Sequence, residues 1–212
     1  MATTGLRDLK KARTRRLIAD TAARLFAERG YEHVAVSDVA REAEVAEQTV
    51  YNYFPTKEQL VTDREQQVQD RLCDLIRSRP PGVTPAAAIR GFVLDEANAG
   101  IRGIPPEIWR GELGYLAAIS PTVHRLVLDV TDRQAAALAT AISDTTAVAP
   151  EVARLQGIAL AAVFQIIITD AGQRTRDGRS PAEIADELRP IAENILDELD
   201  RWLSVSAPPA QR

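Results

Sequence analysis

The sequence predicts an all-α protein in which a small N-terminal domain of three helices is followed by a larger helical domain. Apolar residues recur at the spacing of an amphipathic helix along almost the whole chain, as at Ile18, Ala22 and Phe26. Segments with this spacing end at Gly or Pro, and many begin at Ser or Thr, as helices do. In addition, no stretch alternates β-branched and polar residues as a strand would.

Composition is typical of a soluble globular protein. The 212 residues are 45% hydrophobic and 26% charged, which is enough to bury a large core. The chain shows no apolar leader and no run of about 18 apolar residues, so we expect a cytoplasmic protein without a membrane segment. Its one cysteine, Cys73, excludes an internal disulfide.

Charge is distributed unevenly along the chain. The net charge is −4, yet six basic residues and a single acidic one, Asp8, lie within the first 19 positions. This basic arm indicates either a contact with a polyanion or a solvated tail, and the charge pattern leaves both interpretations open.

Three helices are expected in the N-terminal domain, residues 1–57, and they span residues 13–29, 37–43 and 47–53. Gly30 follows the first helix at a position that favours left-handed backbone. Ser37 is expected to cap the second helix, and Val50 and Phe54 form the inner face of the third. Two short helices joined by a turn and backed by another helix form a helix-turn-helix.

Six further helices are expected in the larger domain, residues 58–206, before a disordered tail at 207–212. Their approximate bounds are 56–79, 84–100, 108–116, 120–142, 151–173 and 180–203. The start signals are a capping box at Thr56–Gln59, then Thr84, Ser120-Pro121, Pro150 and Ser180-Pro181.

The outward face of the helix predicted at 47–53 is polar and aromatic. Amide side chains such as Gln48 and Asn52 can bind adenine through two hydrogen bonds, and hydroxyl groups can bind phosphate. Lys57 adds a cation close to this face. The pattern favours DNA binding; the alternative is a three-helix packing unit whose aromatic residues turn inward.

Three segments, IADTAARLFAERGY (18–31), VSDVAREA (36–43) and VAEQTVYNYFPTK (45–57), resemble the DNA-binding region of TetR-family transcriptional regulators. The remainder of the chain is similar to the family only in its length and helical character. The resemblance implies a homodimeric repressor whose recognition helices enter successive major grooves of a palindromic double-stranded DNA operator. It also implies that a small-molecule effector in the larger domain releases the DNA.

Carried over position by position, the implied DNA contacts are Ser37, Glu47, Gln48, Thr49, Tyr51, Asn52, Tyr53 and Lys57. We expect Gln48, Thr49 and Asn52 to read bases, and the two tyrosines and Lys57 to bind the backbone. Secondary candidates for phosphate or minor-groove contacts in the basic arm are Arg13, Arg15 and Arg16.

The sequence departs from the family pattern around the turn. Glu44 stands where Gly is frequent, so the backbone either avoids a positive φ or accepts strain. Ala46 removes a side-chain cap. Glu47 accepts a bond from cytosine in one interpretation, and in the other it only complements the helix dipole.

The last two helices resemble the family's four-helix dimer bundle, and the alternative is that they cover the core of their own subunit. Apolar residues in the final helix alternate three and four apart, as helix-on-helix packing requires. The expected interface residues are Ile158, Ala162, Ile166, Leu188, Ile191, Ile195, Leu199 and Trp202.

An effector pocket is expected among aromatic side chains of the larger domain, with a few polar anchors. Its candidate residues are Phe92, Trp109, Tyr115, His124, Phe164 and Gln165, with Asn98 and Glu112 as further anchors. Because the central helices carry few charges, we expect an apolar or weakly polar ligand. No cofactor and no metal are expected.

Two other classes of function compete with DNA-binding regulation. An enzyme is disfavoured because the two histidines, His33 and His124, form no zinc-spaced pair, and no phosphate loop or nucleophile elbow is present. The other rival is a helical interaction protein whose DNA-reading face has decayed. Within DNA binding, activation remains open beside repression.

Overall fold

The computed structural model describes residues 3–95 and 113–205, and the account below concerns these residues. Its helices are α1 (Thr3–Arg29), η1 (Tyr31–His33, a 3₁₀ turn), α2 (Val36–Glu42), α3 (Glu47–Tyr53), α4 (Gln59–Arg77), α5 (Pro85–Asp95), α7 (Leu113–Ile119), α8 (Pro121–Ser143), α9 (Pro150–Arg176) and α10 (Pro181–Val205). Within the described ranges no strand occurs, and the prediction of an all-α protein is confirmed.

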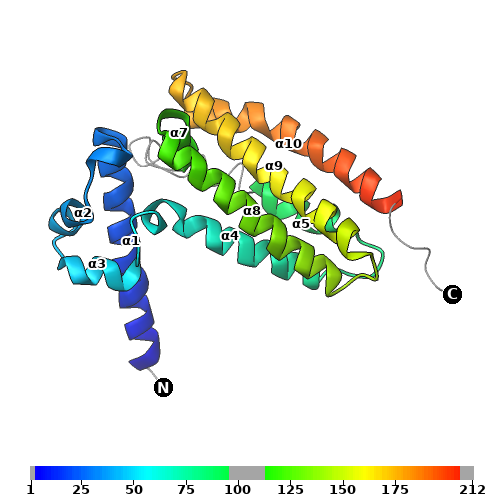
Figure 1. The fold of residues 1–212 in the computed structure, drawn as a ribbon, viewed down its shortest axis with the longest axis horizontal. Helices are drawn as coiled ribbons and strands as arrows, with labels where there is room; N and C mark the ends of the chain where they lie inside the picture. Colours follow the sequence, from blue (N-terminus) through cyan, green and yellow to red (C-terminus); the bar gives the residue numbers. More distant parts are fainter. Residues whose placement is uncertain (1–2, 96–112, 206–212) are drawn as a thin grey trace.

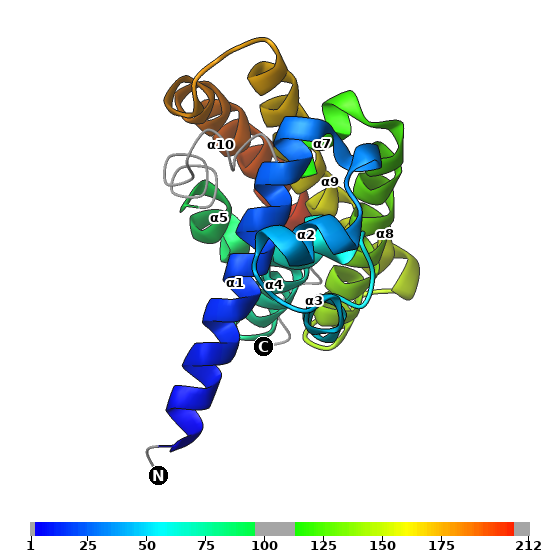
Figure 2. The same ribbon diagram turned by 90° about the vertical axis from the view of Figure 1, so that its left-hand side faces the viewer.

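Figure 1 shows two regions, a head made of α1 to α3 and a body made of α5 and α7 to α10. Helix α4 leads from the head into the body and lies beside α8. The N-terminal half of α1 projects beyond α3, as both Figure 1 and Figure 2 show. Any surface formed by α3 therefore lies at the end of the molecule that also carries the basic arm.

The head differs from the prediction at two helix starts. Helix α1 begins at Thr3 instead of Arg13, so the basic arm is part of a helix. Its Leu, Lys, Arg and Ala residues are good helix formers, which explains the longer helix. Ser37 does not cap α2, because the cap is Ala35 and the Asp38 carboxylate accepts the Ala35 N–H at 3.0 Å.

The other predicted helix signals in the head agree with the structure. Helix α3 has the predicted bounds, with Val50 and Phe54 buried. Gly30 has a φ of 82°, and its N–H donates to the Phe26 carbonyl at the end of α1. These features depend on local backbone geometry and could therefore be predicted from the sequence.

Helix starts in the body are capped largely as predicted. The hydroxyls of Thr84 and Ser120 accept N–H groups three residues ahead, at 3.0 and 3.1 Å. Ser180 exchanges hydrogen bonds with Glu183. Helix α4 begins at Gln59, whose N–H points to the Thr56 hydroxyl at 3.4 Å. The segment expected to carry Ile108 and Trp109 lies outside the described residues before Leu113.

Helix α9 lies at the centre of the body and approaches its neighbours through glycines. A methyl group on Gly172 would overlap the backbone of Gly114 in α7. One on Gly157 would overlap the carbonyl of Ala135 in α8. Such close crossings require residues without a side chain and bring the helix backbones into direct contact.

Among the described helices, only α9 has the length and apolar composition to cross a membrane. In its most apolar window 44% is buried inside the protein, where it packs against α7, α8 and α10. Because core helices of soluble proteins have the same composition, this property is weak evidence for a membrane segment.

The apolar core of the head extends into the body. Ile18, Phe26 and Phe54 belong to the same buried cluster as Leu116 of α7 and Val123 of α8. The head is therefore packed directly on the start of α8. The domain boundary at residue 57 stays a prediction, and this cluster crosses it.

Candidate DNA-binding surface

Helix α3 presents one exposed polar strip. Val50 is fully buried, whereas Gln48 and Asn52 are exposed one turn apart, with 3.3 Å between Gln48 Nε2 and Asn52 Oδ1. Tyr51 is 40% exposed and adds a phenol ring and its hydroxyl to the same surface. Both carboxamides therefore face solvent side by side, and their contact with bases stays a prediction.

The other predicted residues of α3 lie at the margins of this strip. Glu47 is exposed at the first position of the helix, and Thr49 is half-buried. Tyr53 is also half-buried and packs against the core of the head. Ser37 is exposed in the first turn of α2. The predicted DNA contacts thus divide into exposed groups and two partly inward groups.

Of the two backbone conformations expected at Glu44, in the turn between α2 and α3, the protein adopts the strained one with a positive φ. Glu44 has a φ of 54° and is the one non-glycine residue with positive φ in the described part of the chain. The neighbouring Val45 N–H donates to the Ala40 carbonyl at 3.0 Å, which closes the turn. Ala46 precedes α3 without a side-chain cap, as predicted. Strain at Glu44 is therefore accepted to place α3 across α2.

Lys57 is engaged with the head. Its Nζ donates to the Tyr31 carbonyl at 2.6 Å and lies 4.2 Å from the centroid of the Tyr31 ring. Burial lowers the pKa of Lys57, and burial together with Glu58 and Glu32 raises the pKa of Tyr31 to about 12. Lys57 thus holds η1 against the start of α4, and a role in phosphate binding stays a prediction.

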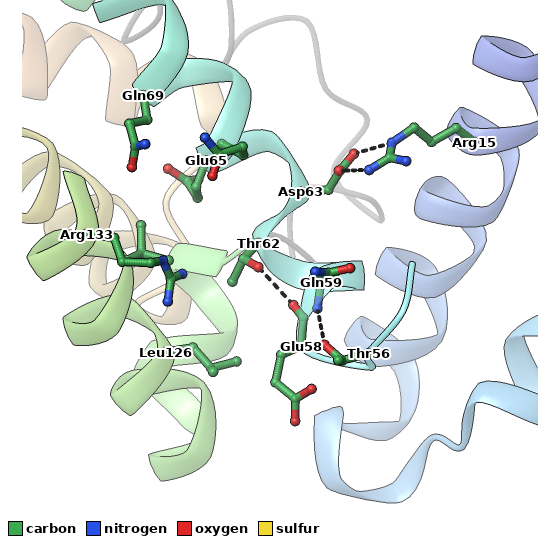
Figure 3. Close-up of a pocket in the computed structure, with 12 residues that line it drawn as sticks. Arg15, Thr56, Glu58, Gln59, Thr62, Asp63, Glu65, Gln69, Leu126 and Arg133 are labelled. Atoms are coloured by element: carbon green, nitrogen blue, oxygen red, sulfur yellow. Dashed lines mark hydrogen bonds and ion pairs between the residues drawn. The ribbon is translucent and has the colours of Figure 1, made fainter. Parts of the chain in front are cut away.

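The arginines of the basic arm differ in orientation. Arg13 and Arg16 are exposed, and Arg16 makes only a loose pair with Asp20 at 3.7 Å. Arg15 instead turns inward and binds Asp63 of α4 (Figure 3). In this conformation the guanidinium of Arg15 faces protein acceptors, and its phosphate contact stays a prediction. Its partner is 48 residues away, and no signal in the sequence identified it.

The structure does not gather the predicted effector residues in one place. Phe92 and Phe164 belong to the core cluster of the body, whereas Tyr115 packs against the core of the head. Gln165 is half-buried, and His124 is exposed because Val123 and Val127 take the inward face of α8. Trp109, Asn98 and Glu112 lie outside the described residues.

Two cavities in the described part of the molecule have other linings. A polar groove of about 450 Å³ lies between α4 and α8 (Figure 3), and Asp63, Gln66 and Arg133 line it. A second cavity of about 670 Å³ lies at the far end of the body, next to Arg77 and Thr146. Neither cavity includes a predicted effector residue.

Sequence reasoning missed a buried amide in the body. Gln134 of α8 is 2% exposed, and its Nε2 has no hydrogen-bond partner among the described residues. Buried donors without an acceptor are rare in proteins. Its spacing from Val127 and Leu138 places it on the inward face of α8, among residues that read as ordinary core.

The predicted dimer residues divide into three groups. Ile158 and Ile166 of α9 and Trp202 of α10 are 48%, 40% and 37% exposed. Half-buried positions are Ala162, Ile191, Ile195 and Leu199. Leu188 is fully buried in the core of its own subunit, so its assignment to an interface is wrong. The register of α10 against α5 and α9 decides which apolar residues remain accessible.

Within the described ranges, no three His, Cys, Asp or Glu side chains are grouped so that they could hold a metal ion. The prediction that the protein needs no metal stays a prediction.

Comparison with known proteins shows that the region containing α3 matches a known protein family. Residues 18–63 match the family described as bacterial regulatory proteins, tetR family. The chain is 30% identical over 124 residues to the HTH-type transcriptional regulator TcmR of Streptomyces glaucescens, which covers 58% of this chain and 51% of TcmR. It is 32% identical over 76 residues to the uncharacterized HTH-type transcriptional regulator YuxN of Bacillus subtilis (strain 168), and the aligned residues make up 35% of this chain and 26% of YuxN. The matches thus span about half of TcmR and a quarter of YuxN.

Solved structures share the fold over most of the chain. NalD, the secondary repressor of the MexAB-OprM multidrug efflux pump in Pseudomonas aeruginosa, is similar with a TM-score of 0.57 at 20% identity, over 92% of this chain and 97% of NalD. FadR of Thermus thermophilus in complex with lauroyl-CoA gives a TM-score of 0.50 at 22% identity, over 93% and 99%. At such identities the likeness concerns the fold.

Proposed function

Since the chain belongs to the TetR family of bacterial regulatory proteins, we propose that it is a sequence-specific DNA-binding transcriptional regulator. In this proposal it is a ligand-responsive repressor that binds a palindromic operator as a homodimer in the cytoplasm. The observation that carries the proposal is the exposed strip of α3, where Gln48 and Asn52 lie side by side above a buried Val50.

The strip has the chemistry of a major-groove reader. Carboxamide groups offer a donor and an acceptor together, which matches the N6 and N7 atoms of adenine. Tyr51 of α3 and Ser37 of α2 supply exposed hydroxyls, which are groups that bind phosphate oxygens. Thr49 and Tyr53 contribute only their accessible parts.

Dimerisation would use the exposed apolar stripe of α9 together with α10. Leu155, Ile158 and Ile166 lie along α9 and are 40% to 53% exposed, which is costly on a surface facing water. Trp202 adds an aromatic side chain at the end of α10. A symmetric pair would bury these residues and present two α3 helices to two half-sites.

The effector is proposed to be apolar or weakly polar and to enter the body near Phe92 and Phe164. The unpartnered Nε2 of Gln134, on the inward face of α8, supports one polar contact to the effector, since a ligand oxygen would satisfy it. We propose neither catalysis nor membrane association. The direction of control, repression or activation, depends on where the operator lies in the promoter.

Selection of bound duplexes from a random pool, followed by a salt titration, tests the proposal. The expected result is an inverted repeat whose affinity falls steeply with salt, as it does for proteins that bind phosphates. Recovery of unrelated sequences, or equal binding to a scrambled duplex, would show that α3 does not read DNA. A helical interaction protein would give that outcome.

A further inference from the structure

Arg15 of α1 uses all three of its guanidinium nitrogens. Nε donates to Asp63 Oδ2 at 3.0 Å, Nη2 binds Oδ1 of the same carboxylate, and Nη1 donates to the Tyr53 carbonyl at 2.9 Å (Figure 3 shows the pair with Asp63). The Cζ atom lies 4.5 Å from the centroid of the Phe54 ring. A two-point guanidinium–carboxylate pair of this kind fixes geometry as well as charge.

These contacts join three elements. Tyr53 is the last residue of α3, where carbonyl groups have no partner within the helix. Asp63 lies in α4, which continues into the body. Arg15 therefore ties the end of the proposed recognition helix to α4, from an anchor in α1. The hydrogen bond to Asp63 also raises the pKa of Arg15.

A role in phosphate binding would require a different orientation. The side chain of Arg15 is 38% exposed, whereas that of Arg16, one residue further, is 84% exposed. All the donors of Arg15 named above point to protein acceptors, so a phosphate would have to compete with Asp63. Arg13 and Arg16 are the arginines of this segment that face solvent.

We propose that Arg15 is a positioning residue for operator binding, which holds α3 in a fixed place relative to α4. The inference rests on the proposed function. In a dimer, α4 connects each head to the body, so the link sets the separation of the two recognition helices. It binds no DNA itself.

The groove between α4 and α8 makes the link accessible to a small molecule. Arg15 and Asp63 both belong to its lining, and its volume of about 450 Å³ exceeds that of an alkylguanidinium ion. A guanidinium added in solution can therefore reach the Asp63 carboxylate when the Arg15 side chain is removed.

Operator affinity, measured with the selected inverted repeat at several salt concentrations, tests the proposal. Asp63→Asn should weaken binding by about tenfold or more, although it removes a negative charge from a DNA-binding protein. Arg15→Ala should weaken operator binding by the same factor. The double variant, which combines Arg15→Ala with Asp63→Asn, should bind no more weakly than either single variant. Asp63→Asn should also flatten the preference among repeats whose half-sites are moved by one base pair, which a general loss of stability would not do.

Arg16→Ala is the matched control for a direct phosphate contact, because it removes a neighbouring exposed arginine. Its salt slope should be smaller than that of the unaltered protein. Addition of n-propylguanidinium, against sodium chloride at equal ionic strength, should restore binding in Arg15→Ala and leave the double variant unchanged. Should Arg15→Ala fail to fold, Asp63→Asn and Arg15→Lys carry the same comparison.

Three results overturn the inference while the proposed function stands. These are unchanged or tighter binding by Asp63→Asn, a smaller salt slope in Arg15→Ala like that of Arg16→Ala, and an equal response of Arg15→Ala and the double variant to the guanidinium. If the unaltered protein prefers no inverted repeat, the proposed function fails and this inference falls with it.

Discussion

The hydroxyl of Ser120 connects to Glu32 across the junction between head and body. Ser120 accepts the N–H of Val123 at 3.1 Å as the cap of α8, and its own proton goes to the Glu32 carboxylate. One side chain thus begins a body helix and holds the 3₁₀ turn of the head. The apolar cluster shared by Phe26 and Leu116 lies behind this polar link.

This link predicts a loss of stability in acid. The hydrogen bond from Ser120 lowers the pKa of Glu32 below its ordinary value of 4.5. A depressed folded-state pKa stabilises the protein above the unfolded value, and the contribution is lost as the pH falls through the folded value. The free energy of unfolding of the unaltered protein should therefore fall more as the pH is lowered from 6 through 4.5 to about 3 than that of Glu32→Gln. Parallel curves in denaturant titrations would contradict the link.

Tyr31 predicts an effect at high pH. Its pKa is raised to about 12, chiefly because burial disfavours the phenolate. For a raised folded-state pKa, the stabilisation is complete below the ordinary value of 10.0 and is lost as the pH rises through the folded value. Absorbance at 295 nm should show one tyrosine titrating near 12, unless unfolding comes first, and Tyr31→Phe should remove that step. Ionisation of all tyrosines near 10 would show that Tyr31 is accessible.

Glu44 predicts a gain in stability on substitution by glycine. Its φ of 54° is unfavourable for any residue with a side chain, so Glu44→Gly should stabilise the head by up to about 1 kcal/mol in chemical denaturation. Gln67→Gly, in the middle of α4, is the control and should cost about 1 kcal/mol. Equal losses in the two variants would mean that the turn stores no strain.

Asn52 predicts a base-specific effect. If its carboxamide binds one adenine, Asn52→Ala should weaken operator binding by about 1–3 kcal/mol and relax selection at a single base position. The matched variant Gln67→Ala changes an exposed carboxamide of α4 outside the proposed DNA and dimer contacts, and should leave selection unaltered. Unchanged base preference in Asn52→Ala would remove this residue from the proposed contacts.

The exposure of Ile158 on α9 leads to a prediction about the position of the dimer interface. A carboxylate in the proposed interface would be buried without a partner, so Ile158→Glu should sediment as a monomer. Leu128→Glu is the control, because Leu128 is similarly exposed at 43% but lies on α8 outside the proposed interface. A dimeric Ile158→Glu, or a monomeric Leu128→Glu, would move the interface to another surface.

Much of the fold and part of the candidate surface could be predicted from the sequence. The bounds of α3, the caps at Thr84 and Ser120 and the left-handed Gly30 depend on residues within four positions of one another. Spacing over the same short distance along the chain also predicted that Val50 and Phe54 face inward and that Gln48 and Asn52 face outward. Helical periodicity fixes such faces before any tertiary contact forms.

Only the tertiary structure decided which member of an equivalent set faces inward. Arg15 and Arg16 are neighbouring arginines that the sequence does not distinguish. Asp63, 48 residues away, binds Arg15, whereas Arg16 remains in solvent. Leu188 and Trp202 belong to one apolar seam, and the packing of α10 buries the first and exposes the second. The choice between such residues depends on how the helices are rotated and placed against one another, and the side chains that set this rotation come from distant parts of the chain.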